Sequence, residues 1–247
     1  LGIIGGGQLG SMLAIAAKKL NIKTVILCDD VDAPAQNFCS KFIYGAYSDR
    51  EKILEFIRQV DIVTFEFENI PYETLDEINK SKPVLPKPSV NRLIQHRLAE
   101  KDFVNKLNIR TTRYVSIEKK SDIESLEDFL PGILKTTTLG YDGKGQHPIQ
   151  SIEDLNLLNI DFSKGYILEK LVKLKKEISI IITRFKNQKY EIYEPIENTH
   201  KDQILKHSKI PADIDNKIFN QSKDWAISIA EELKYVGTLC VEFFIDK

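Results

Sequence analysis

The sequence predicts a mixed α/β protein of two domains, α+β overall, whose first domain is built on a Rossmann-like parallel sheet. Three observations support this prediction. Short apolar runs alternate with amphipathic helical segments through the first part of the chain, as in a parallel sheet with crossover helices. Gly5–Gly10 follows the first apolar run in the pattern G-x-G-x-x-G and opens a helix. A cluster of prolines ending at Pro88 then interrupts the alternation, which predicts one domain at 1–88 and another at 89–247.

Composition argues against several broad classes of function. Of the 247 residues, 42% are hydrophobic and 29% are charged, and Lys+Arg 35 against Asp+Glu 36 leaves a formal charge of −1. This balance gives no support for nucleic acid as a partner. The cysteines, Cys28, Cys39 and Cys240, have no metal-binding or redox spacing and fit the reduced thiols of a cytoplasmic protein. No apolar run approaches the roughly 20 residues of a membrane span, so no membrane partner is expected.

The first domain is predicted to alternate strands and helices. Its strands are expected at Leu1–Ile4, Thr24–Cys28, Lys41–Tyr44, Asp61–Phe67 and Val84–Leu85. Two helices are expected at Asp49–Val60 and Tyr72–Lys80. A further helix begins at the glycine-rich segment, and we expect it to bury a face made of Leu9, Met12, Leu13, Ala16, Ala17 and Leu20.

The glycine-rich segment also has the spacing of a dinucleotide-binding fingerprint, because Asp29 and Asp30 follow it by about 20 residues. A NAD-dependent dehydrogenase is therefore a competing interpretation. The amino end of a helix accepts a phosphate from any ligand, so the motif predicts the fold more firmly than the ligand. Glu66 and Glu68 share one face near the carboxyl end of a strand, where open α/β sheets bind ligands. A solvated strand end is the alternative.

The second domain begins with a helical stretch that Ser89 caps and that carries Arg97 and Lys101. Further helices are predicted at Ser121–Phe129, Ser151–Leu158 and Asp213–Lys234. Strands are predicted at Arg113–Ser116, Gly132–Lys135, Gln146–Gln150 and Gly165–Glu169, from Glu177 onward, and at Lys189–Tyr193 and Gly237–Ile245. Glu197–His200 is predicted to form a polar turn.

A loop rich in glycine and lysine connects two strands of this domain. Lys135–Gln146 reads K-T-T-T-L-G-Y-D-G-K-G-Q. Glycine lets backbone N–H groups approach a ligand closely, and successive amides in such a turn bind anions. Lys135 and Lys144 add point charges suited to phosphate. We interpret the loop as a lid over nucleotide phosphates, with a mobile hairpin carrying solvated lysines as the alternative.

Three carboxylates of the second domain are candidates for ligand binding. Glu177 and Glu242 lie in strongly apolar strands, where an ionised carboxylate needs a partner, a ligand or a metal ion. If Glu169 is free to accept from the amine of an adenosine and Glu177 from its hydroxyls, the two carboxylates suit an adenosine ligand. Glu242 shares a face with Cys240 and Phe244, and hard oxygen ligands of this kind hold Mg²⁺.

Six motifs occur in sequence along the chain. They are G-G-G-Q-L-G at Gly5–Gly10, F-E-F-E-N-I at Phe65–Ile70, R-L-x-E-K at Arg97–Lys101, G-Y-D-G-K-G-Q at Gly140–Gln146, E-N-x-H at Glu197–His200 and G-T-x-x-V-E-F-F at Gly237–Phe244. In this order they resemble the ATP-grasp superfamily, and within it the N5-carboxyaminoimidazole ribonucleotide synthases of purine biosynthesis. The resemblance extends over essentially the whole chain and outweighs the dehydrogenase interpretation.

The resemblance implies a fold and a reaction. An ATP-grasp domain follows the first domain and is incomplete at its C-terminus, with a lid subdomain at about 112–170 and a partial large subdomain at 171–247. The implied reaction is the ATP- and bicarbonate-dependent carboxylation of the amine of 5-aminoimidazole ribonucleotide, through carboxyphosphate. The implied cofactors are ATP and Mg²⁺, and the implied assembly is a cytoplasmic homodimer.

The resemblance also implies residue roles. Tyr141, Asp142 and Lys144 are the catalytic candidates, and the first two are expected to face bicarbonate. Within the ATP site, Glu169–Val172 should line the adenine and Glu177 should take the ribose hydroxyls. The full set of expected ATP-binding residues is Arg97, Lys135, Gly140, Tyr141, Asp142, Gly143, Lys144, Gly145, Gln146, Glu169, Lys170, Leu171, Val172, Glu177, Glu197, Asn198 and His200. The ribonucleotide is expected at Gly7, Gln8, Leu9, Glu68 and Asn69, and Mg²⁺ at Glu242.

Some features depart from the family pattern. Ser11 and Thr137 stand where the family usually has basic residues, which removes two charges from the phosphate contacts. The family's second Glu/Asn metal pair and its basic, His-containing stretch are absent from the 247 residues. We therefore expect a chain cut at both ends that binds adenosine groups without completing a turnover. Another ATP-grasp ligase such as a formate-using transformylase, a NAD-binding dehydrogenase and a nucleotide-binding fragment with a regulatory role are the alternatives.

Overall fold

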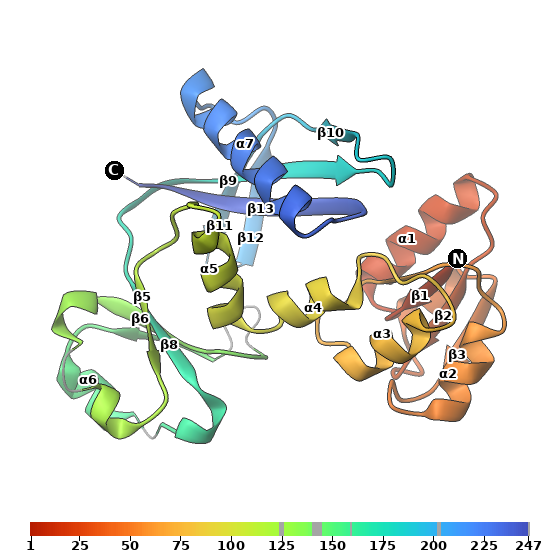
Figure 1. The fold of residues 1–247 in the computed structure, drawn as a ribbon, viewed down its shortest axis with the longest axis horizontal. Coiled ribbons are helices and arrows are strands. Elements are labelled where there is room, and N and C mark those ends of the chain that lie inside the picture. Colours follow the sequence, from red (N-terminus) through yellow and green to blue (C-terminus); the bar gives the residue numbers. More distant parts are fainter. Residues whose placement is uncertain (124–125, 140–144, 159, 202–203, 247) are drawn as a thin grey trace. The chain divides into compact units, whose positions relative to one another are not determined.

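The computed structural model divides into two compact units, Leu1–Ile94 and Gln95–Lys247. It describes all residues except 124–125, 140–144, 159, 202–203 and 247. The division falls shortly after the proline cluster, and Figure 1 shows the course of the chain through both units. Among the described residues, no helix combines the length and apolar character that crossing a membrane requires.

The first unit has the predicted parallel sheet, with strand order β3-β2-β1-β4. Its strands are β1 (Gly2–Ile4), β2 (Val25–Cys28), β3 (Lys41–Tyr44) and β4 (Val63–Phe65). Its helices are α1 (Gln8–Lys19), α2 (Arg50–Ile57), α3 (Tyr72–Asn79) and α4 (Pro88–Ile94), with a short 3₁₀ turn η1 (Pro34–Asn37). The Rossmann-like fold class predicted from the sequence is confirmed.

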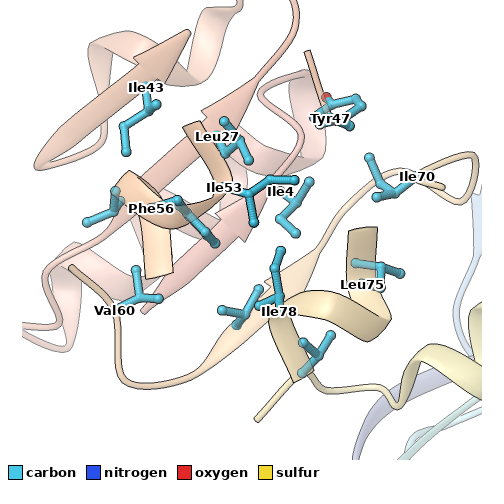
Figure 2. Close-up of a cluster of buried hydrophobic side chains, with 13 residues drawn as sticks. Ile4, Leu27, Ile43, Tyr47, Ile53, Phe56, Val60, Ile70, Leu75 and Ile78 are labelled. Atoms are coloured by element: carbon cyan, nitrogen blue, oxygen red, sulfur yellow. The ribbon is translucent and has the colours of Figure 1, made fainter. Parts of the chain in front are cut away.

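The largest core of this unit lies between the sheet and the helices α2 and α3. Figure 2 shows the cluster of buried side chains, with Phe56 of α2 near Val60 and the strand residues Ile4 and Leu27. Phe56 is fully buried, and a Cβ added at Gly2 would lie 2.5 Å from its Cζ atom. Strand β1 therefore approaches α2 so closely that only glycine fits at this position.

The predicted buried face of α1 is wrong except for Ala17, which is buried as expected. Leu9, Met12 and Leu20 are more than half exposed, and the helix instead buries its small residues Gly10, Ser11, Ala14 and Ala17. A Cβ added at Gly10 would lie 2.7 Å from the carbonyl oxygen of Gly5. The helix packs close to the strand-turn segment through its small side chains, which leaves the large ones on the outer face.

The second unit contains an antiparallel sheet with strand order β5-β8-β6-β7. Its strands are β5 (Tyr114–Ile117), β6 (Gly132–Thr136), β7 (Gln146–Ile149) and β8 (Tyr166–Lys170). The helices that belong to this part are α5 (Arg97–Lys106) and α6 (Ile152–Leu157), with 3₁₀ turns η2 (Lys120–Ile123), η3 (Glu127–Phe129) and η4 (Phe162–Lys164). Leu134 and Leu168 are fully buried at the centre of its core.

Two predicted helices differ in the structure. The stretch that was expected to begin at Ser89 is divided into α4 and α5, because His96 adopts an extended conformation and caps α5 through its side chain. The predicted helix Ser121–Phe129 consists, in its described residues, of the short turns η2 and η3. The Asp122 carboxylate accepts hydrogen bonds from the N–H groups of Glu118 and Lys119, which favours a local turn over a continuous helix.

A second sheet of this unit has the path β10-β9-β11-β12, with β13 pairing along the other edge of β9. Its strands are β9 (Leu174–Arg184), β10 (Tyr190–Ile192), β11 (Ile196–Lys201), β12 (Ile204–Lys209) and β13 (Gly237–Asp246). Helix α7 (Asn216–Glu232) contacts β9 and β13. Glu197–His200 is thus part of strand β11 and does not form the predicted turn, because it pairs with both β9 and β12.

Candidate active site

A carboxylate of the first unit itself hydrogen-bonds to the backbone of the glycine-rich loop. Glu66, directly after β4, accepts a hydrogen bond from the N–H of Gly7 at 2.9 Å. Gly5 has a φ of +97°, and a Cβ added there would lie 2.7 Å from Oε1 of Glu66. On its other side the loop packs against Ala33, since a Cβ at Gly6 would lie 2.8 Å from the Ala33 Cβ. An internal carboxylate thus takes the loop amide that a dinucleotide phosphate would use.

The residues predicted to hold the ribonucleotide lie at one edge of the parallel sheet. Gly7, Gln8 and Leu9 follow β1, while Glu68 and Asn69 follow β4, and these strands are hydrogen-bonded neighbours. Gln8, Leu9 and Glu68 are exposed. The glycine loop and the acidic segment are therefore brought together where a ligand of an open α/β sheet is expected.

We expect Glu66→Ala to lower the free energy of unfolding by about 1–2 kcal/mol, because the substitution leaves the Gly7 N–H without its acceptor. Glu66→Gln keeps an acceptor oxygen of the same reach and should lose less than half as much. Urea unfolding of the two variants measures the difference. Equal losses in both variants would contradict the hydrogen-bonding role of this side chain.

A three-membered ion cluster lies in the second unit. The Glu169 carboxylate on β8 lies 2.9 Å from Nζ of Lys135 on β6 and 3.3 Å from Nζ of Lys101 on α5. The three side chains are only 8%, 16% and 15% exposed, in that order. Sequence analysis assigned Lys135 and Glu169 to the nucleotide but missed Lys101. The available signal was its place in R-L-x-E-K, one helical turn after Arg97.

Burial and charge oppose each other in this cluster. Burial raises the pKa of the Glu169 carboxyl, but Lys135 and Lys101 outweigh it, and the net shift is downward. Burial lowers the pKa of Lys101, and neighbouring Lys135 adds to this effect, while Glu169 only partly offsets it. Glu169 is therefore held ionised, and one carboxylate serves two cations.

The expectation that Glu169 is free for an adenine amine is wrong in this structure, because its carboxylate is paired with two lysines. The backbone beyond it is also engaged. The N–H of Lys170 donates to Arg113, and the N–H of Leu171 donates to Pro131. The carbonyl of Val172 accepts from Leu174. Any adenine recognition by Glu169–Val172 has to use the remaining backbone groups of this segment.

Glu177, Asn198 and His200 are brought together on one face of the second sheet. Glu177 on β9 lies directly opposite Asn198 on β11. Nδ1 of His200 lies 2.5 Å from Oε2 of Glu177, and both side chains are about a quarter exposed. Asn198 donates a hydrogen bond to the Ser179 hydroxyl at 2.6 Å. This arrangement offers a carboxylate oriented by an imidazole, next to a fixed amide.

Glu197 does not join this group, although it was assigned to the same pocket. It lies opposite Ile178, on the other face of the strand pair from Asn198. Its carboxylate lies 3.0 Å from Nζ of Lys176 and accepts the N–H of Asp213. The hydrogen bond from Lys176 lowers the pKa of Glu197. Glu197 ties β11 to the segment that precedes α7.

Glu242 lies on β13, directly opposite Ser179 of β9. It shares a face with Cys240 and Phe244, as expected, but all three are exposed, so the apolar strand does not by itself force this carboxylate to find a partner or a metal ion. Among the described residues, no group of three or more His, Cys, Asp or Glu side chains is arranged to hold a metal ion. Glu242 therefore supplies one exposed carboxylate opposite Ser179, the hydrogen-bond partner of Asn198.

Most of the predicted lid, Gly140, Tyr141, Asp142, Gly143 and Lys144, lies outside the described residues. Its two flanks are described. Gln146 pairs directly with Lys135 across β6 and β7, and Gly145 has a φ of +69°. The backbone N–H of Arg97 donates to the carbonyl of Thr137 at 2.8 Å. The first residue of α5 is thus held beside the end of the strand that carries Lys135.

Ser11 and Thr137, which stand where the family usually has basic residues, both make hydrogen bonds within the protein. Ser11 is buried and donates its hydroxyl to the carbonyl of Gly7 at 2.9 Å. Thr137 is also buried and donates to the carbonyl of Lys164 at 3.1 Å. Both side chains point into the protein interior, so neither position offers an exposed contact to a ligand phosphate.

Family comparisons place these features in context. The ATP-grasp domain model matches residues 102–247, and the model of the ribonucleotide synthetase preATP-grasp domain matches residues 1–95. Together they define a protein of the ATP-grasp superfamily, with the preATP-grasp domain in front. The N5-carboxyaminoimidazole ribonucleotide synthase of Brucella melitensis is 35% identical over 252 residues, which cover 100% of this chain and 70% of the relative. The chain belongs to the N5-carboxyaminoimidazole ribonucleotide synthase family.

Solved structures agree with this assignment. The N5-carboxyaminoimidazole synthetase of Staphylococcus aureus complexed with ADP has a TM-score of 0.92 at 33% identity, covering 99% of this chain and 66% of that one. The carboxyaminoimidazole ribonucleotide synthase of Aspergillus clavatus complexed with ATP has a TM-score of 0.87 at 26% identity, covering 100% and 66%. The present chain thus spans about two thirds of the length of these relatives.

Proposed function

We propose that this chain takes part in the ATP-dependent carboxylation of the amine of 5-aminoimidazole ribonucleotide, in de novo purine biosynthesis. The observation that carries the proposal is that the Glu177, Asn198 and His200 group and the Lys135–Glu169 pair lie within an ATP-grasp domain. The ADP and ATP complexes of the two solved relatives support a nucleotide as the ligand. The carboxylate closing the glycine loop counts against a dehydrogenase.

In the proposed reaction bicarbonate is the source of the new carboxyl group. Bicarbonate is a poor electrophile, so one of its oxygens attacks the γ-phosphorus of ATP, the bond to the β-phosphate oxygen breaks, and ADP leaves. The substrate amine then attacks the carboxyl carbon of carboxyphosphate, or the CO₂ it releases. Phosphate leaves with the electrons of the C–O bond, and the nitrogen loses a proton. Catalysis of such a sequence is mostly positioning and electrostatic stabilisation.

The proposed roles of the residues are those that the family resemblance implies. Arg97 and Lys135 bind the nucleotide phosphates, and Gly140–Gln146 closes over them so that water does not hydrolyse the intermediate. Glu177, oriented by His200, accepts the ribose hydroxyls, with Asn198 beside it. Glu169–Val172 lines the adenine. Tyr141, Asp142 and Lys144 act on bicarbonate and the transferred phosphoryl group, and Gly7–Leu9 with Glu68–Asn69 holds the ribonucleotide.

Magnesium belongs to the proposal, but the described residues do not form a site for it on their own. Glu242 is one carboxylate, and Mg²⁺ takes carboxylate and phosphate oxygens in octahedral geometry. A homodimer and a cytoplasmic location remain predictions, and sedimentation of the chain across a concentration series tests the first.

5-Aminoimidazole ribonucleotide and ATP should each shift the NMR signals of a different part of the chain. In an amide NMR titration, 5-aminoimidazole ribonucleotide should shift the signals of Gly7–Leu9 and Glu68–Asn69. ATP should shift those of β9 and β11. Shifts of the glycine loop by NADH, with none from the ribonucleotide, would overturn the assignment of the acceptor.

The carboxyphosphate step has its own signature. During turnover by a full-length member of the family, with bicarbonate whose oxygens carry a heavy isotope, each phosphate released should contain one labelled oxygen. Phosphate free of the label, released together with carboxylated product, would contradict that intermediate.

A further inference from the structure

The Lys101, Glu169 and Lys135 cluster carries an excess of positive charge. Two ammonium groups face one carboxylate, and all three side chains come from different elements of the same unit. Each lysine has its own oxygen of the Glu169 carboxylate: Oε1 lies nearest Lys101, and Oε2 accepts a hydrogen bond from Lys135. The cluster as a whole is therefore one charge positive. A neutral Lys135–Glu169 pair would remain if Lys101 were absent.

In the part of the chain that the structure describes, Glu169 is the carboxylate recorded within ion-pair distance of Lys101. Its ammonium lies 5.4 Å from the centre of the Tyr114 ring on β5 and 3.4 Å from the Thr112 hydroxyl. Glu100, the neighbouring residue on α5, contributes a weaker attraction than Glu169. Asp102, also on α5, accepts the Tyr114 hydroxyl at 2.6 Å. The nearest strong partner of Lys101 is thus Glu169, which it shares with Lys135.

We propose that Lys101 is a positioning residue of the nucleotide site, which shares Glu169 so that Lys135 keeps charge available for the nucleotide phosphates. This inference rests on the proposed function, because it takes Lys135 as a phosphate ligand. Lys101 itself does not touch the nucleotide. A fully neutralised lysine attracts an anion weakly, whereas a lysine whose counter-ion is divided between two cations remains attractive.

The low exposure of the cluster supports this role. A partly buried cation that lacks a partner of its own is costly, so its retention at this position calls for a compensating interaction. Burial lowers the pKa of Lys101, and the attraction of Glu169 does not fully offset this effect. An incoming phosphate would relieve the excess charge of the whole cluster.

The test compares ADP with adenosine, which lacks the phosphates, by calorimetric titration in metal-free buffer. Lys101→Met should weaken ADP binding about tenfold at neutral pH and leave adenosine binding unchanged. Lys101→Arg should restore ADP affinity, because it keeps the charge. Lys106→Met, at an exposed lysine of the same helix, is the matched control and should bind both ligands as the wild type does.

The pH dependence separates charge from packing. As the pH rises to about 9.5, Lys101 loses its proton earlier than an ordinary lysine, so the wild-type affinity for ADP should fall. Lys101→Arg stays charged and should lose less affinity over the same range. The two lysines hold the pKa of Glu169 below its usual value, so its carboxylate stays ionised throughout this range.

Three results would overturn the proposal. One is ADP binding by Lys101→Met at wild-type strength, and another is equal weakening of ADP and adenosine, which indicates a packing role. The third is failure of Lys101→Arg to restore binding. If the wild type binds neither ADP nor adenosine, the proposed function fails together with this inference. If it binds both and the variants do not differ, only the inference fails.

Discussion

Glu177→Ala should weaken ATP binding by about 10- to 100-fold, because it removes a carboxylate proposed to accept the ribose hydroxyls. Hydrogen bonds to a charged group contribute about 1.5–3 kcal/mol each, which corresponds to this range. The substitution also leaves His200 without the carboxylate that orients it. Isothermal titration of the purified variant with Mg-ATP measures the loss.

Glu197→Ala is the matched control for this prediction. Glu197 is the neighbour of Asn198 in the sequence, but its side chain lies on the opposite face of β11 and pairs with Lys176. We expect Glu197→Ala to reduce stability slightly and to leave ATP affinity within about twofold of the wild type. Equal loss of affinity in both variants would mean that the two faces of β11 do not have the separate roles inferred here.

Phe56→Ala should have the largest effect on stability, about 3–5 kcal/mol in the free energy of unfolding. Phe56 is fully buried at the centre of the core in the first unit, against Val60 and the strands. Gly2→Ala should also destabilise the unit, by about 1–3 kcal/mol, because its new Cβ would lie 2.5 Å from the Phe56 ring. Urea unfolding monitored by circular dichroism measures both.

The double variant provides the sharper test. Without the Phe56 ring, the Cβ at position 2 no longer meets it. The loss of unfolding free energy in the double variant should therefore be smaller than the sum of the two single losses by about 1 kcal/mol or more. Strict additivity would show that the close approach of Gly2 and Phe56 does not limit this core.

The parallel sheet of the first unit could be predicted because its signals are local. Apolar runs of strand length and the spacing Gly5–Gly10 are both visible within a few residues. The packing of α1 could not be read in the same way. Large and small apolar residues share its helical period, and the close contact of Gly10 with Gly5, which selects the small ones, is a feature of the folded chain.

The sequence predicts the candidate site as a set of residues, whereas the contacts among them appear only in the folded chain. The pairing of Glu177 with His200 joins two motifs that were already identified separately. The pairing of Lys101 with Glu169 joins α5 to β8, and no local pattern predicts which lysine meets which carboxylate. The strand at Glu197–His200 was missed because its polar composition is typical of a turn, while its pairing partners lie elsewhere in the sequence.

The most direct test of the central claim is a calorimetric titration of this chain with Mg-ATP, repeated with NADH. The proposed nucleotide site predicts binding of ATP, its loss in Glu177→Ala, and no heat from NADH, since Glu66 already occupies the glycine loop. Binding of NADH without binding of ATP would contradict the account, and would mean that the glycine loop of the first unit, and not the second unit, recognises the nucleotide.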